Sequence, residues 1–259
     1  MTVDLAQFLG QGQQVLLAAG IVFLRVGAMI ALLPVFGERV VPARVRMALA
    51  VCFTLIVAPA ASPAIGAALA QGVAPAQFLV SETIVGLAIG IVLRLMILAL
   101  QITGHIAAQA ISLSQLLGAG AGDPQPALGH FLTVAGLALA AMSGLHVAAA
   151  ETMISSYEVM PAGRILPADV LAEWGVRAVA FSFDLALRLA MPFVVVSLLY
   201  NLALGVINRA MPQLMVALVG APAITAGGMI LFALAAPMML GLWLEQFHHL
   251  LADPTGVAR

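Results

Sequence analysis

The sequence predicts an all-α protein that crosses a membrane several times, with about six apolar helices arranged as hairpins. Hydrophobic residues make up 63% of the 259 residues and charged residues only 8%, whereas soluble domains carry roughly a quarter charged residues. Several apolar runs are long enough, or nearly so, to cross a hydrocarbon core, which requires about 20 residues. No polar linker separates these runs, so we expect a single membrane domain over residues 1–259.

Six apolar runs account for the expected helices. In chain order they are Val15–Phe36, Met47–Ala61, Phe78–Leu100, Leu128–Ala150, Ala178–Ile207 and Leu214–Leu244. Proline-containing stretches separate them, and Pro59 and Pro63 are expected to end the second helix. The second run is short for a full crossing, and Pro222 and Pro237 interrupt the last one. We therefore expect some segments to be kinked or re-entrant.

The charged residues argue against a nucleic-acid-binding protein and predict how the helices are oriented in the membrane. Ten basic residues, all arginine, face 11 acids, so no basic patch indicates a nucleic-acid partner. Cys52 is the only cysteine and can form neither an internal disulfide nor a metal site of several thiolates. Arg39, Arg44 and Arg46 cluster in one short loop. The positive-inside rule places this loop in the cytoplasm and both termini in the periplasm.

Charges inside the apolar runs are candidate functional groups. Arg25 lies near the middle of the first run, where insertion costs about 2.5–3.5 kcal/mol, so it needs a partner or water. A structural ion pair and a water-filled path are equally compatible with it. Asp184 and Arg188 are four residues apart on one helical face, and we favour a structural pair over an ion route. Glu82 and Arg94 lie nearer the ends of their run and are expected to reach the interface.

A stripe of polar side chains distinguishes the end of the third helix from its neighbours. Its members recur at steps of four, four and three residues and therefore share one helical face. They are Gln101, His105, Gln109 and Ser112.

Small residues predict close helix packing at two places. Gly86 and Gly90 form a G-x-x-x-G pattern. A second set of small residues at steps of four forms one continuous stripe along the fourth run. Its members are Gly136, Ala140, Gly144 and Ala148.

Enzymatic chemistry finds little support in the sequence. The Ala141–Gly144 stretch is close to the nucleophile turn of rhomboid-type proteases, although it lacks the first glycine. His146 follows Ser143 on the same helix and cannot readily be aimed back at the hydroxyl, so we reject a serine protease. Glu245 and His248 form a single Glu-x-x-His pair, whereas a di-iron bundle needs two pairs. The sequence thus predicts no catalysis, no metal and no cofactor.

Several motifs, taken in order, resemble the flagellar export-gate proteins of the FliR type, whose counterparts serve type III secretion systems. They are Pro34–Gly37, Val41–Arg46, Gly118–Pro124, Leu128–Leu132, Ser156–Gly163, Asn201–Gly205 and Arg209–Leu214. The resemblance covers most of the chain. Two positions depart from the family pattern: Ala119 and Ala121 stand where members usually carry an aromatic residue, and Met215 stands where they carry an asparagine.

The resemblance implies a structural role in flagellum biogenesis and protein export. In that family the protein assembles with FliP and FliQ, and with FlhB nearby, into a channel for unfolded flagellar proteins in the bacterial inner membrane, at the basal body. The polar stripe is then expected to face water or neighbouring subunits. The glycine loop is expected to act as a pore plug; its residues are Gly118, Gly120, Gly122, Asp123 and Pro124.

A small-molecule or ion transporter is the alternative from another class. Such proteins place polar residues on broken helices near the membrane midplane. Arg25, Asp184 and Arg188 leave this alternative open, although no clear internal repeat supports it.

Overall fold

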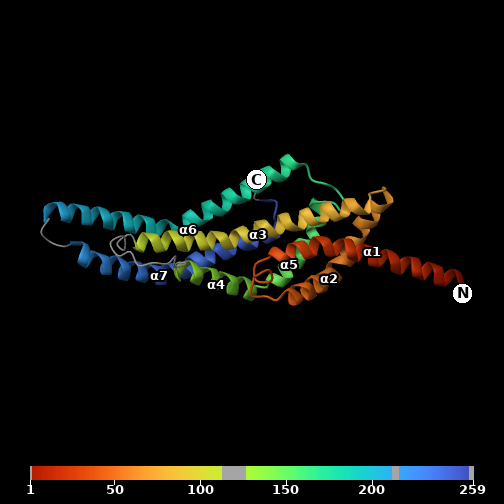
Figure 1. The fold of residues 1–259 in the computed structure, drawn as a ribbon, viewed down its shortest axis with the longest axis horizontal. Helices are drawn as coiled ribbons and strands as arrows, with labels where there is room; N and C mark the ends of the chain where they lie inside the picture. Colours follow the sequence, from red (N-terminus) through yellow and green to blue (C-terminus); the bar gives the residue numbers. More distant parts are fainter. Residues whose placement is uncertain (1, 113–126, 212–215, 257–259) are drawn as a thin grey trace. The chain divides into compact units, whose positions relative to one another are not determined.

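The computed structural model describes residues 2–112, 127–211 and 216–256, with side chains described for residues 12–111, 127–211 and 223–256. All the regular structure within these ranges is α-helical (Figure 1). The helices are α1 (Thr2–Leu32), α2 (Ala43–Ala70), α3 (Pro75–Ser112), α4 (Ala127–Met142), α5 (Leu145–Val159), α6 (Ala168–Ala210) and α7 (Val216–Ala252).

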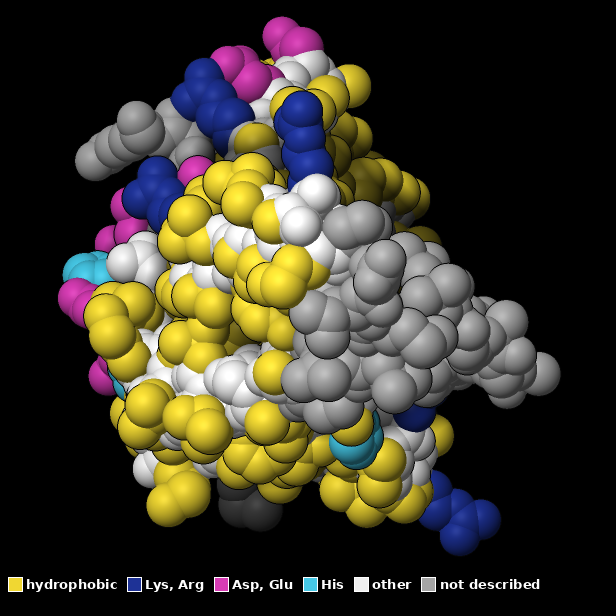
Figure 2. Space-filling model, turned by 90° about the vertical axis from the view of Figure 1, so that its left-hand side faces the viewer, with side chains coloured by type: hydrophobic (Ala, Val, Ile, Leu, Met, Phe, Trp, Pro, Cys, Tyr) yellow, Lys and Arg dark blue, Asp and Glu magenta, His cyan; other side chains and the backbone are white. Residues whose placement is uncertain are grey.

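Five of these helices are long and apolar enough to cross a membrane: α1, α2, α3, α6 and α7. The bent pair α4 and α5 passes the same test as one broken span or re-entrant segment. Hydrophobic side chains make up much of the described surface on the face drawn in Figure 2, as lipid or partner helices require. The prediction of an all-α polytopic membrane protein is confirmed.

The prolines do not end the helices as expected. Pro59 and Pro63 lie inside α2, which continues to Ala70, so the prediction of a short second segment is wrong. The turn follows at Gln71 and Gly72, whose φ of +81° favours glycine. Proline removes one hydrogen bond, but in an apolar environment a helix still satisfies the surrounding peptide groups better than any open turn. α6 and α7 likewise continue through their prolines.

The fourth apolar run is broken where one helix was expected. α4 ends at Met142 and α5 begins at Leu145, and the two are bent by 74° at this break. Gly144 has a φ of +84°, a conformation that glycine adopts without steric cost. The expected continuous stripe of small residues is therefore wrong: Gly136 and Ala140 lie on α4 and Ala148 on α5.

The chain divides into two compact units, which we describe separately. Unit 1 contains Met1–Leu95, Ala140–Val179 and Phe247–Arg259, and unit 2 contains Met96–Leu139 and Ala180–Gln246. The single-domain expectation stays a prediction.

In unit 1, α1 packs along α2, and α2 also contacts α5. The first half of α3 approaches α1 at two glycines. A Cβ atom on Gly86 would collide with the carbonyl oxygen of Arg25 and lie 2.9 Å from Ala28 Cβ. A Cβ atom on Gly90 would lie 2.9 Å from Leu32 Cβ. The G-x-x-x-G pattern thus sits where two backbones come close.

Candidate functional site

Arg25 forms a closed polar cluster in the core of unit 1. Its Nε donates to Glu82 Oε2 at 2.8 Å, and its Nη2 donates to Glu82 Oε1 at 3.2 Å. Nη1 donates to Ser156 Oγ at 3.0 Å, and Nη2 also donates to the Met160 carbonyl at 2.9 Å. The guanidinium carbon lies 3.8 Å from the centre of the Tyr157 ring. The side chains of Arg25 and Glu82 are only 1% and 0% exposed.

The turn after α5 closes this cluster. Gly163 has a φ of +73°, and its N–H donates to Glu82 Oε1 at 3.0 Å. A Cβ atom there would come within 2.8 Å of Phe78 and Val73. Gln77 Nε2 donates to the Gly163 carbonyl at 2.8 Å, which ties the turn to the start of α3. Two long-range contacts therefore hold the turn against the ion pair.

The cluster decides what Arg25 can do. A bidentate arginine–carboxylate pair is strong and geometrically specific, and Ser156 and Met160 accept from two of the three remaining N–H groups. Glu82 was expected at the interface, and that prediction is wrong. A charge so fully paired and enclosed matches a structural ion pair and leaves little of the guanidinium free for a passing ion.

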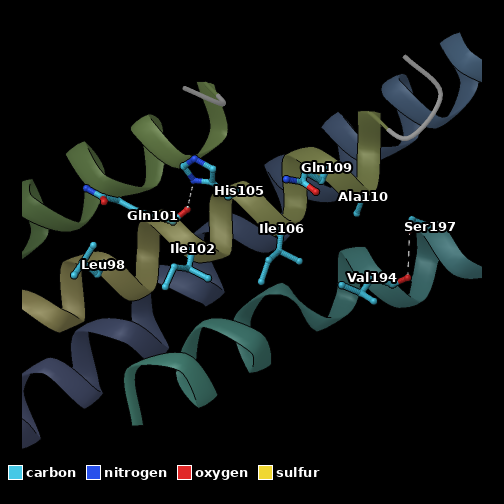
Figure 3. A pocket seen from close by; sticks show the side chains of 9 residues that line it. All are labelled: Leu98, Gln101, Ile102, His105, Ile106, Gln109, Ala110, Val194 and Ser197. Carbon is cyan, nitrogen blue, oxygen red and sulfur yellow. Dashed lines mark hydrogen bonds between the residues drawn. The ribbon is translucent and has the colours of Figure 1, made fainter. Parts of the chain in front are cut away.

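Three members of the polar stripe lie together at a pocket of about 580 Å³ in unit 2. Gln101, His105 and Gln109 project from one side of α3, whereas Ile102 and Ile106 point toward α6 (Figure 3). The remaining lining residues are Leu98, Ala110, Val194 and Ser197. The side chain of Ser112 lies outside the described residues.

The pocket offers hydrogen-bonding groups on an otherwise apolar lining. His105 Nδ1 lies 2.8 Å from the Gln101 carbonyl, which can only accept, so Nδ1 carries the hydrogen and Nε2 is the acceptor in the neutral ring. The side-chain amides of Gln101 and Gln109 have no hydrogen-bond partner within the described part of the chain. Each amide can donate and accept, so this face can pair with either half of a peptide group.

Close packing against α4 and α6 fixes the part of α3 that carries the pocket. A Cβ atom on Gly104 would collide with Gly129 Cα and lie 2.5 Å from Gly129 N, so α3 and α4 touch through their backbones. One residue earlier, Thr103 Oγ1 bonds the Ala99 carbonyl at 2.8 Å and approaches the Ala186 carbonyl of α6 at 3.2 Å. Gln101 and His105 flank this contact. Their backbone is therefore held from two sides.

The core of unit 2 is built around Trp243. Its Nε1 donates to the Met96 carbonyl at 2.8 Å, and the side chain is 0% exposed. Gly136 makes room for it, because a Cβ atom there would collide with Leu100 and lie 3.5 Å from Trp243.

The Asp184–Arg188 pair forms at 2.7 Å, with side chains 52% and 76% exposed on the surface of this chain. The pair is therefore not buried in the chain's own core.

The candidate plug lies outside the described residues. Its members are Gly118, Gly120, Gly122, Asp123 and Pro124.

The hydroxyl of Ser143 has a histidine within hydrogen-bond distance. On sequence grounds, only His146 was considered as a base for this serine. His248 Nε2 lies 2.9 Å from Ser143 Oγ, although the two residues are far apart in the sequence. The hydroxyl hydrogen, however, is donated to the Ala140 carbonyl at 2.9 Å. His248 then donates to the serine oxygen, the reverse of the arrangement that activates a nucleophile. Among the described residues, no group of three or more His, Cys, Asp or Glu is placed to hold a metal ion.

The sequence as a whole is similar to a family of bacterial proteins. Residues 16–250 match the family described as Bacterial export proteins, family 1. The flagellar biosynthetic protein FliR of Caulobacter vibrioides is 33% identical over 235 residues, which cover 90% of this chain and 94% of that relative. The chain belongs to the FliR family. FliR of Escherichia coli is 29% identical over 89% of each chain, and FliR of Bacillus subtilis is 27% identical over 78% of this chain and 79% of its own.

This FliR-family chain is therefore a membrane-embedded protein of flagellar export. One motif that carried the resemblance, Ser156–Gly163, is the segment that closes around Arg25 and Glu82. Sequence reasoning singled out Arg25 and noted Glu82 as a weaker candidate, but it did not pair the two, which are 57 residues apart, because nothing local links the positions. It also missed the close contact between Gly104 and Gly129, which joins two separate helices.

Proposed function

We propose that the chain is a non-enzymatic structural subunit of the flagellar type III export gate in the bacterial inner membrane, at the basal body. With FliP and FliQ homologues, and with FlhB beside them, it forms the channel through which unfolded flagellar proteins leave the cytoplasm. The observation that carries this proposal is the family match over residues 16–250, which includes nearly all the described helices.

The pocket on α3 is the part of the chain that suits such a channel. Exported proteins differ in sequence but share a peptide backbone, and an amide can pair with either half of a peptide group. Gln101 and Gln109 are eight residues apart, or about 12 Å along a helix. An extended chain covers that distance in about four residues. The stripe therefore faces the aqueous path or a neighbouring subunit that lines it.

Two further points belong to the same proposal. The loop with Gly118, Gly120 and Gly122 obstructs the closed pore, a role supported by the family resemblance alone. The transporter alternative is weakened at Arg25, because its partners enclose it in unit 1.

Replacing the pocket amides tests this function. Gln101→Leu combined with Gln109→Leu should lower secretion of flagellar proteins and motility several-fold, because the apolar side chains cannot bond a passing backbone. Secretion into the medium is measured in cells whose own gene is deleted, with the variant level checked in the membrane fraction. Gln246→Leu is the control, since this glutamine is a half-exposed residue of the same unit outside the pocket.

Full secretion by the Gln101→Leu/Gln109→Leu variant would show that these amides do not serve export. Full secretion by the deletion strain itself would overturn the export function as a whole.

A further inference from the structure

The segment from Arg39 to Arg46, which joins α1 to α2 and includes the first turn of α2, carries three arginines. Arg39, Arg44 and Arg46 form no ion pair among the described residues. Between Asp4 and Glu82 the sequence contains a single acid, Glu38. That acid is already occupied by Arg94, which contacts both carboxylate oxygens, one of them at 3.3 Å. Three positive charges without an ion pair among the described residues are therefore gathered in one short stretch.

The three arginines differ in how far their side chains are exposed. Arg39 and Arg44 are exposed, whereas Arg46 is half-buried and its Nε is a buried atom with no hydrogen-bond partner among the described residues. A buried donor without a partner is costly, and an incoming acceptor would satisfy it. The first turn of α2 holds no acidic residue and Pro42 gives no side-chain cap, so the helix start adds a positive potential.

Apolar side chains alternate with the arginines. Val40 is 92% exposed, Val45 48% and Met47 64%. Such a mixture is unfavourable in water alone and in hydrocarbon alone, but it suits the boundary between them. α1 ends at Leu32 and α2 begins at Ala43, and both helices can cross a membrane. A segment that joins two such helices is expected at a membrane surface.

Hydrogen bonds hold the backbone of this segment in place. The Gly37 N–H bonds the Leu33 carbonyl at 2.7 Å, and the Val41 N–H bonds the Glu38 carbonyl at 2.9 Å. The Glu38–Arg94 contact ties the segment to α3. The arginines therefore project from a backbone that these contacts keep in place.

We propose that Arg39, Arg44 and Arg46 form a binding site for the phosphate headgroup of an anionic phospholipid. Arginine matches phosphate with several parallel hydrogen bonds. The exposed Val40 and Met47 enter the acyl region beside the headgroup, and the arginines stay at its phosphate. This site is separate from the pocket on α3 and does not depend on what the chain exports.

The test measures binding of fluorescent phosphatidylglycerol to the purified full-length chain in mixed micelles. Each surface arginine contributes about fivefold to anionic lipid affinity. Arg39→Gln/Arg44→Gln should therefore weaken phosphatidylglycerol binding about 25-fold, and 0.3 M salt should weaken the wild type. Arg39→Lys/Arg44→Lys keeps the charge but loses the parallel hydrogen bonds, so its affinity should lie between those of the wild type and Arg39→Gln/Arg44→Gln. Phosphatidylcholine should bind weakly to every variant.

The matched control is Arg164→Gln/Arg209→Gln, which removes the same charge from two exposed arginines that form no ion pair among the described residues. It should weaken phosphatidylglycerol binding clearly less than Arg39→Gln/Arg44→Gln does, because Arg164 precedes α6 and Arg209 lies in its last turn, so the two form no cluster. Equal loss in both double variants would reduce the effect to net charge and overturn the site. Unchanged lipid binding by Arg39→Gln/Arg44→Gln, with loss of co-purifying subunits, would assign the segment to a protein partner instead. Circular dichroism of each variant shows that the fold is kept.

Discussion

At the scale of single residues, the Arg25–Glu82 pair joins three segments of unit 1. Both side chains are buried, and α1, α3 and the turn after α5 all contribute to the cluster. A buried pair is often no more stable than apolar residues of the same shape, but removing one partner leaves an uncompensated charge. We infer that the pair fixes how these three segments meet more than it adds to stability.

Arg25→Leu should insert into the membrane well, because a cost of insertion is removed. It should nevertheless lower the free energy of unfolding by about 3–5 kcal/mol, because Glu82 stays buried without its partner, and it should impair assembly or export. Arg25→Leu/Glu82→Leu should be more stable than Arg25→Leu. Denaturant titration of the purified protein measures both values.

Arg177→Leu in the same unit is the control for this cycle, since its exposed i,i+4 pair with Glu173 contributes only about 0.3–0.5 kcal/mol. If Arg25→Leu were as mild as Arg177→Leu, with normal motility, the cluster would have no structural role.

At the scale of helices, glycines decide which backbones touch. Gly104→Ala should destabilise unit 2 by about 1–3 kcal/mol, because the added methyl group meets the backbone of Gly129. Gly227→Ala on α7 is the control, because a Cβ atom there meets nothing within 4 Å. It should be neutral or stabilise by up to about 1 kcal/mol. Thermal unfolding followed by helical circular dichroism compares them, and equal stability of the two variants would contradict the close α3–α4 contact.

Hydropathy predicted the helices because long apolar runs are a local property of the sequence. The helix ends were harder to predict, since Pro59 and Pro63 usually break helices but here lie inside one. The break at Gly144 depends on a left-handed backbone conformation, which the neighbouring sequence does not predict. The stripe of Gln101, His105 and Gln109 was predictable from helical spacing. Its pocket was not, because Val194 and Ser197 come from α6.

At the scale of the whole molecule, much apolar surface remains uncovered. Only 17% of the apolar window of α6 is buried within this chain, and the exposed pair Asp184–Arg188 lies on the same helix. Lipid can cover the apolar side chains, but an ion pair facing hydrocarbon is costly. Neighbouring helices that shelter this pair would remove that cost. The chain alone is therefore expected to be an incomplete unit.

The mass of the complex purified from cells that co-express this chain with FliP and FliQ homologues tests the central claim most directly. We predict one stable assembly that contains all three proteins, and a lower yield of this chain, still sufficient for purification in detergent, when it is expressed alone. A monodisperse monomer that needs neither partner, and that restores motility without forming a complex, would contradict the account.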